Sequence, residues 1–281
     1  MDVKLHISFE FFSVKTQHGL EKVHAMCTEL ARYEPEFYSV TYGAGGSTRS
    51  STHDLAISLQ RAGFETAPHL SFGSDDQADI IALLSTYKAE GISNLVALRG
   101  DLPSGLGGTK SLVHANELVA LTRQSFGSHF DINVAAYPEI HPESESYHSD
   151  LYWLGEKLRA GANRAITQYF FNADAYFRFI DEAQKVGIDA PVIPGIMPIT
   201  NFLNLVRFSD NCGAEIPRWL RWQLKQRSAD SEDLIRFGID VVTQLCSRLI
   251  EGGAPGLHFY TMNNLAVTNE LCQNLSLPRQ L

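Results

Sequence analysis

One pattern of hydrophobic and polar positions recurs along the chain: an amphipathic helix, a glycine, a short polar link and then an apolar strand. The segment "KAEGISNLVALRG" ends a helix and starts a strand in this way. Apolar residues at helical spacing precede it, as at Ile80, Leu84 and Tyr87, and a glycine just past a helix suits the left-handed conformation that ends many helices. The pattern therefore predicts helices that alternate with strands along the chain.

Eight apolar segments are predicted to be strands. They span residues 5–12, 37–43, 66–72, 94–100, 131–137, 164–171, 191–196 and 256–261. Each is followed by a helical stretch, and eight such alternations with short links favour a (β/α)8 barrel of the α/β class. A doubly wound open sheet is the alternative, but the G-x-G-x-x-G turn of such folds is absent after the first strand.

No linker rich in Pro, Gly or Ser divides the sequence, so we expect residues 1–281 to form one catalytic domain. That length is ordinary for a single barrel of about 250 residues. The stretch 213–232 exceeds one strand–helix unit and predicts an extra helix near residues 215–228. Asn172 and Thr200 stand before helical stretches and are predicted to cap them.

The composition of the chain argues against some classes of binding partner. The net charge of −9 at pH 7 argues against a general nucleic-acid or anionic-membrane binder. The four cysteines show no C-x-x-C spacing, and the chain has neither a signal-peptide core nor an apolar stretch long enough to span a bilayer. We therefore expect a cytoplasmic protein that binds small molecules, without a metal site.

Unusual residues fall where the strands are expected to end, which is where barrel enzymes build their sites. These positions are Glu10, "TYGAGGST" after the second strand, His69, "RGDLPSGLGG", "YPEIHPE", Gln168 and Tyr260. Each has a structural explanation when taken singly: a strand histidine is more often a satisfied core residue than a ligand, and a buried carboxylate such as Glu10 needs only a partner. Their shared location at the strand ends favours a functional site there.

Eight segments, in the same order, resemble the methylenetetrahydrofolate reductases of the bacterial single-domain type. They are "FEFF", "SVTYGAGG", "PHL", "LRGDLP", "AAYPEIHPE", "GANRAITQYFF", "PGIMPI" and "HFYTMN", and the resemblance runs from about residue 7 to residue 275. It implies a flavin-containing (β/α)8 barrel. Such an enzyme reduces 5,10-methylenetetrahydrofolate to 5-methyltetrahydrofolate with NADH or NADPH, by ping-pong transfer through non-covalent FAD. It also implies a role in one-carbon metabolism and methionine biosynthesis, and a homo-oligomer.

The resemblance assigns catalytic roles to two carboxyl groups. Glu10 matches the general acid that protonates the leaving nitrogen of the folate, and Asp101 matches the residue that stabilises the resulting iminium cation. A carboxyl donates a proton near neutral pH only when its pKa is raised. We expect Phe9, Phe11 and Phe12 to supply the apolar surroundings that raise the pKa of Glu10.

The resemblance also implies the binding residues. For FAD they are Thr41, Tyr42, Ala44, His69, Arg99, Gly100, Asp101, Ala115, Tyr137, His141, Asp150 and Lys157. For the folate and the nicotinamide they are Asp101, Gln168, Phe208 and Tyr260.

Several positions depart from the family pattern. Ser13 and Val14 replace a common Pro-Pro pair, and Trp153 and Glu156 replace more polar and basic residues near the adenosine end of FAD. Asn264 stands where an arginine is common, which puts binding of a polyglutamate tail in question. Two alternatives stay open: another flavin- or pterin-binding barrel reductase, and a non-catalytic barrel that binds a ligand.

Overall fold

The computed structural model describes residues 5–41, 49–72, 76–99 and 114–277. Its strands form one parallel sheet in the order β7-β6-β5-β4-β3-β2-β1-β9-β8. The strands are β1 (His6–Phe11), β2 (Phe37–Val40), β3 (Thr66–Leu70), β4 (Asn94–Ala97), β5 (Asp131–Ala136), β6 (Arg164–Thr167), β7 (Val192–Ile193), β8 (Gly195–Ile196) and β9 (Gly256–Tyr260).

The sheet closes on itself through Pro194. β7 pairs with β6, and β8 pairs with β9, while Pro194 separates the two short strands. Proline has no N–H to donate to a strand ladder, so the predicted seventh strand is split in two. The predicted (β/α)8 barrel is confirmed, with this interruption.

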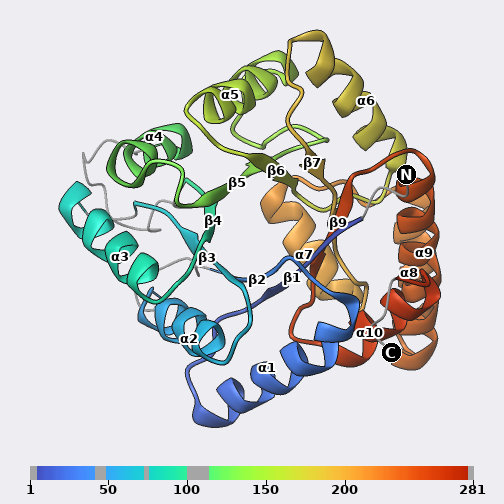
Figure 1. Cartoon of the computed structure of the whole chain (residues 1–281). Helices are drawn as coiled ribbons and strands as arrows, with labels where there is room; N and C mark the ends of the chain where they lie inside the picture. The colour runs from blue at the N-terminus through green and yellow to red at the C-terminus, as the bar shows by residue number, and fades with distance from the viewer. Residues whose placement is uncertain (1–4, 42–48, 73–75, 100–113, 278–281) are drawn as a thin grey trace, which may run out of the picture.

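Helices cover the outside of the ring of strands (Figure 1). They are α1 (Gln17–Leu30), the short 3₁₀ helix η1 (Ala31–Tyr33), α2 (Arg49–Arg61), α3 (Gln77–Ala89), α4 (Ala115–Phe126), α5 (Tyr147–Arg159), α6 (Ala173–Lys185), α7 (Phe202–Cys212), α8 (Arg218–Arg227), α9 (Ser231–Glu251) and α10 (Leu265–Asn274). The helix predicted near residues 215–228 is α8. In Figure 1, α7 crosses the middle of the ring, because it follows the carboxyl end of β8 and turns over the barrel.

One of the two predicted helix caps is confirmed. The Asn172 side chain accepts a hydrogen bond from the backbone N–H of Asp174 at 3.0 Å. The prediction for Thr200 is wrong: the extended residue Asn201 caps α7 instead and accepts from the N–H of Asn204 at 2.9 Å. No helix in the described ranges is both long and apolar enough to cross a membrane.

Apolar side chains pack in two places. The larger cluster lies between strands and helices and contains Phe9 and Phe11. A smaller cluster fills part of the barrel interior and consists of Phe37, Ala67, Val96, Ile166 and Ile193. Because these side chains come from strands around the ring, they close the interior below the carboxyl ends of the strands.

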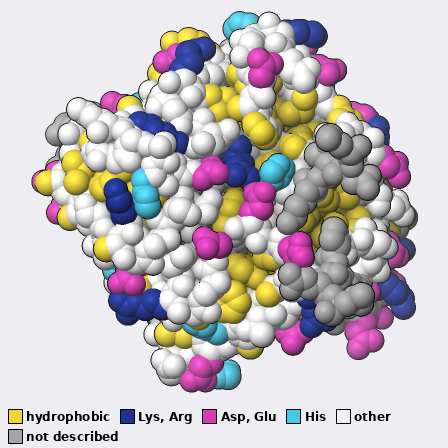
Figure 2. All heavy atoms as spheres, viewed as in Figure 1, with side chains coloured by type: hydrophobic (Ala, Val, Ile, Leu, Met, Phe, Trp, Pro, Cys, Tyr) yellow, Lys and Arg dark blue, Asp and Glu magenta, His cyan; other side chains and the backbone are white. Residues whose placement is uncertain are grey.

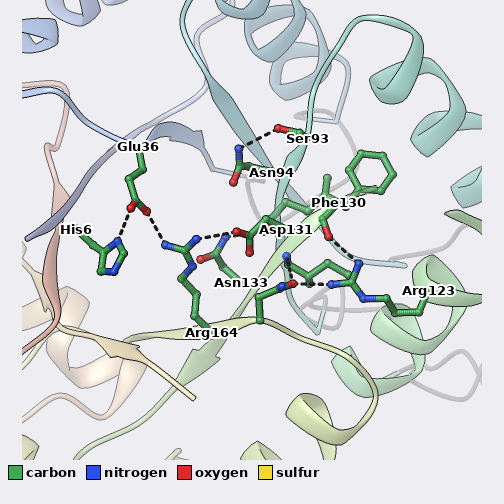
Figure 3. Close-up of polar contacts among 12 residues, drawn as sticks. His6, Glu36, Ser93, Asn94, Arg123, Phe130, Asp131, Asn133 and Arg164 are labelled. Atoms are coloured by element: carbon green, nitrogen blue, oxygen red, sulfur yellow. Dashed lines mark hydrogen bonds and ion pairs between the residues drawn. The ribbon is translucent and has the colours of Figure 1, made fainter. Parts of the chain in front are cut away.

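Charged side chains close the opposite end of the barrel. Basic, acidic and histidine side chains gather in the middle of the face shown in Figure 2. Figure 3 shows Arg164 between two carboxylates, with N–O distances of 2.5 Å to Glu36 and 2.7 Å to Asp131. Glu36 also contacts His6 at the start of β1. These side-chain contacts join β1, β5, β6 and the residue before β2, in addition to the backbone hydrogen bonds there.

Replacing Arg164 with Met should destabilise the fold by about 2–3 kcal/mol, because the change leaves two partly buried carboxylates without their shared cation. The Arg164 side chain is only 16% exposed, so water replaces little of the lost interaction. Urea unfolding at pH 7 measures the change. The control Arg159→Met breaks the exposed pair with Glu156 and should change stability by less than about 0.5 kcal/mol. Equal effects of the two substitutions would contradict a closing role for the network.

Candidate active site

A cavity of about 510 Å³ lies at the carboxyl ends of the strands. Nine of the residues expected to form the site line it: Glu10, Thr41, His69, Arg99, Tyr137, His141, Gln168, Phe208 and Tyr260. They come from strand ends and the segments that follow them, apart from Phe208, which comes from α7. This volume and the mixture of aromatic and polar walls suit a small organic ligand.

Two histidines flank the carboxylate of Glu10 at the inner end of the cavity. Glu10 Oε2 lies 3.0 Å from His69 Nε2 and 3.2 Å from His258 Nε2. The His69 contact has the distance of an ion pair but not the geometry of a hydrogen bond, since that nitrogen has no hydrogen-bond partner. Ser39 Oγ lies 3.4 Å from the same oxygen. The carboxylate therefore sits in a polar cluster inside the barrel.

The second nitrogen of His258 fixes its tautomer. His258 Nδ1 is 2.7 Å from Ser8 Oγ, and the imidazole is fully buried. A neutral imidazole satisfies both contacts when Nε2–H donates to Glu10 and Nδ1 accepts from the Ser8 hydroxyl. Ser8, His258 and Glu10 thus form a hydrogen-bonded chain across adjacent strands β1 and β9.

The prediction of a raised pKa for Glu10 is wrong for this structure. Burial raises the pKa of the carboxyl, but the charge interaction with His69 and the close contacts with both imidazoles outweigh burial, and the pKa falls to about 2. Phe9 and Phe11 lie on the opposite face of β1, where Phe9 stacks on Phe259 with ring centroids 5.6 Å apart. The carboxyl is therefore ionised at neutral pH in the unliganded protein.

Tyr260 and Gly195 shape the wall beside this cluster. The Tyr260 hydroxyl donates to the backbone oxygen of Thr167 at 2.7 Å. A Cβ at Gly195 would lie 2.2 Å from the same oxygen and 2.6 Å from the Tyr260 ring, so only glycine fits there. Burial, and then the negative charge of Glu10, raise the pKa of Tyr260 well above its usual range. The tyrosine stays neutral and rigidly held.

A cationic side of the site lies around β4, β5 and α5. The Lys157 ammonium donates to the backbone oxygen of Ala135 at 2.5 Å and forms no ion pair with any residue in the described ranges. Burial lowers the pKa of Lys157 to about 8, although the charge of Asp150 opposes this shift. The Asp150 carboxylate accepts from the backbone N–H of His141 at 2.9 Å, and Arg99 pairs with Glu143.

The remaining predicted binding residues lie elsewhere. Tyr42, Ala44, Gly100 and Asp101 lie outside the described residues. Ala115 is the buried first residue of α4. Asp150 and Lys157 do not line the cavity, but they hold backbone atoms of residues that do.

The sequence did not predict that His69 and His258 flank Glu10, or that Ser8 hydrogen-bonds His258. The alternation of β1 that directs Glu10 inward also directs Ser8 inward, and the register pairs Ser8 with His258. A search of the inward positions of the last strand would have found the histidine.

Three residues that depart from the family pattern contact other residues of the chain. Trp153 stacks on His114 with ring centroids 5.7 Å apart, and Glu156 pairs with Arg159. The Asn264 side chain caps α10 by accepting from the N–H of Val267 at 3.3 Å. These side chains are thus occupied in contacts within the chain.

Comparison with known proteins decides the family. The sequence model of the methylenetetrahydrofolate reductase family matches residues 2–276. The chain belongs to this family. It is 37% identical over 273 residues to the 5,10-methylenetetrahydrofolate reductases of Salmonella typhimurium and Escherichia coli, covering 97% of this chain and 91% of each relative.

A solved structure also shares the fold. It is an uncharacterized protein from Clostridium thermocellum that binds two copies of 5-methyl-5,6,7,8-tetrahydrofolic acid. The TM-score is 0.69 at 16% identity, and the match covers 98% of this chain and 95% of that one. At this identity the likeness concerns the fold alone.

The partly buried carboxyl of Glu139, between β5 and α5, predicts a pH-dependent stability. Burial raises the pKa of its carboxyl to about 7, although the backbone N–H of Glu215 donates to it at 2.7 Å. A raised pKa in the folded state means that folding binds a proton between about pH 4.5 and 7. Stability from this group is therefore present below about pH 4.5 and lost as the pH rises through 7.

The Glu139→Gln variant should remove this loss, which amounts to about 1 kcal/mol after allowance for solvent screening. Chemical unfolding at pH 5 and pH 7.5 gives the difference for each variant. Glu145→Gln changes an exposed carboxyl in the same loop and should keep the wild-type difference. A Glu139→Gln profile identical to that of the wild type would contradict the assignment.

Proposed function

We propose that this chain reduces 5,10-methylenetetrahydrofolate to 5-methyltetrahydrofolate with electrons from NADH or NADPH, in one-carbon metabolism and methionine biosynthesis. The observation that carries the proposal is the Glu10 carboxylate between two imidazoles at the inner end of a cavity. Membership of the reductase family supplies the substrate class. Such a cluster suits a reaction that needs a proton and develops a positive charge on the substrate.

The cationic side of the site fits FAD. Lys157 is a partly buried ammonium without a carboxylate partner in the described ranges, as expected of a group that meets an anion. We propose that Lys157 and Arg99 face the diphosphate, and that Thr41, His69, Tyr137 and His141 hold other parts of the cofactor. When bound, FAD supplies the two-electron carrier between nicotinamide and folate.

Glu10 delivers the proton that opens the five-membered ring of the folate. Because its pKa is low in the unliganded protein, the acid is the cluster of Glu10, His69 and His258 rather than an isolated carboxyl. We propose that this cluster holds the proton until the leaving nitrogen takes it. Loss of that proton leaves an anion beside the iminium cation, which stabilises the cation.

Residues on the other walls of the cavity orient the flat rings of the two substrates. We propose that Gln168 hydrogen-bonds the pterin or the nicotinamide, and that Phe208 and Tyr260 pack against them. Asp101 lies outside the described residues and is proposed to add a second negative charge near the iminium. Because one cavity serves both substrates in turn, the kinetics are ping-pong.

The electron donor, the oligomeric state and the cellular compartment are inferred from the family type. We propose NADH as the preferred donor and a homo-oligomeric assembly. All four cysteines are free, which suits a reducing cytoplasm. Anaerobic flavin reduction by NADH and by NADPH, measured separately, compares the donors.

Glu10→Gln should separate the two half-reactions. The variant keeps the size of the side chain and an oxygen that can accept from His258, but it has neither the negative charge nor a carboxyl proton. Flavin reduction by NADH should stay within about twofold of wild type, and reoxidation by methylenetetrahydrofolate should fall at least about 100-fold. Stopped-flow absorbance of the flavin measures both rates. Equal losses in both half-reactions would make Glu10 structural.

Lys157→Gln should weaken FAD binding about 10- to 100-fold, because a charge-assisted contact contributes about 1.5–3 kcal/mol. Titration of apoprotein with FAD, followed by flavin fluorescence, measures the affinity. Lys185→Gln serves as the control, because that lysine is exposed on α6 and pairs with Glu182. An unchanged FAD affinity would remove Lys157 from the cofactor site.

A further inference from the structure

The turn after β9 is fastened to the end of β1. The backbone N–H and the hydroxyl of Thr261 both donate to the backbone oxygen of Glu10, at 3.1 and 2.6 Å. Two residues on, Asn263 Oδ1 accepts from the N–H of Phe12 at 2.9 Å, and Asn263 Nδ2 donates to the oxygen of Phe12 at 3.2 Å. Four hydrogen bonds thus join this turn to the segment that carries Glu10.

Two successive residues of the turn have left-handed backbone conformations. Met262 has φ 53° and Asn263 has φ 51°. Asparagine tolerates this region, but methionine adopts it at a cost, and such strain persists only where the surroundings enforce it. The conformation turns the Asn263 carboxamide back onto Phe12, while Met262 lines the cavity.

Phe12 is an exposed aromatic residue at the cavity wall. Its ring is 43% exposed and lines the cavity, although large apolar side chains are usually covered. β1 ends at Phe11, so Phe12 has no neighbouring strand there. The carboxamide of Asn263 binds both its N–H and its C=O, as a strand would. An aromatic face held open in this way suits a flat ring of a ligand.

We propose that Asn263 is a positioning residue that fixes Phe12 as an aromatic wall for the ring system of the folate. The carboxamide acts on the substrate only through Phe12, whose backbone it binds. This inference rests on the proposed folate reduction, and it adds a recognition element on the β1 side of the cavity, apart from Phe208 on α7.

The test uses Asn263→Ala and Asn263→Gly in the FAD-loaded protein. In both variants the apparent affinity for methylenetetrahydrofolate in flavin reoxidation should fall about 10-fold, while flavin reduction by NADH stays within twofold. Glycine adopts positive φ freely, so the Gly variant keeps the turn but lacks the clamp. A Gly variant with wild-type affinity for methylenetetrahydrofolate would overturn the proposal, because the turn would then support folate binding without the Asn263 side chain.

A double-mutant cycle shows whether Asn263 acts through Phe12. Phe12→Leu should weaken folate binding by itself, and Asn263→Ala added to it should change binding by less than about twofold. Fully additive effects would overturn the proposed route. Asn172→Ala is the matched control, because it removes a capping asparagine on α6 and should leave folate binding unchanged.

Hydrogen exchange tests the clamp without substrate. The amide of Phe12 should lose at least about 10-fold protection in Asn263→Ala, whereas amides of β1 keep theirs. Unchanged protection would overturn the clamp even if folate turnover fell. Failure of the wild-type protein to reoxidise its flavin with methylenetetrahydrofolate would instead overturn the proposed function, so the two failures are distinct.

Discussion

The site depends on one constraint: a carboxylate inside a barrel must be surrounded by groups that stabilise its charge. Glu10 meets this condition because two imidazoles lie within 3.2 Å of one of its oxygens. Without them, burial would drive the carboxyl to its neutral form. The imidazoles come from β3 and β9, so the electrostatics of the site depend on the pairing of β3, β2, β1 and β9 side by side.

Closure of the barrel in turn depends on features far from the cavity. Pro194 splits the seventh strand yet leaves β8 paired with β9, on the side of β9 away from β1. Arg164 and its two carboxylates hold β5, β6 and the start of β2 at the opposite end. The apolar cluster between these two layers separates the charged end from the cavity. The ion pairs, the apolar cluster and the cluster around Glu10 thus follow one another from one end of the barrel interior to the other.

The sequence predicted the local structure better than the chemistry of the site. Alternation and helix-ending glycines located every strand, because these signals lie within a few residues of the element they define. The pKa of Glu10 was mispredicted because its decisive partners are 59 and 248 positions away, and His258 is identified only by strand register. Thr200 and Asn201 are equally good caps in sequence, and the path of the chain after β8 selects the second.

The charges of the site are divided along the cavity. Glu10 is negative at the inner end near β1, β3 and β9, whereas the positive Arg99 lines the cavity after β4 and Lys157 lies behind the wall on α5. A ligand that develops positive charge is favoured at the first place, and an anionic ligand at the second. In a chain of net charge −9, local cations rather than the overall field would therefore favour an anionic ligand.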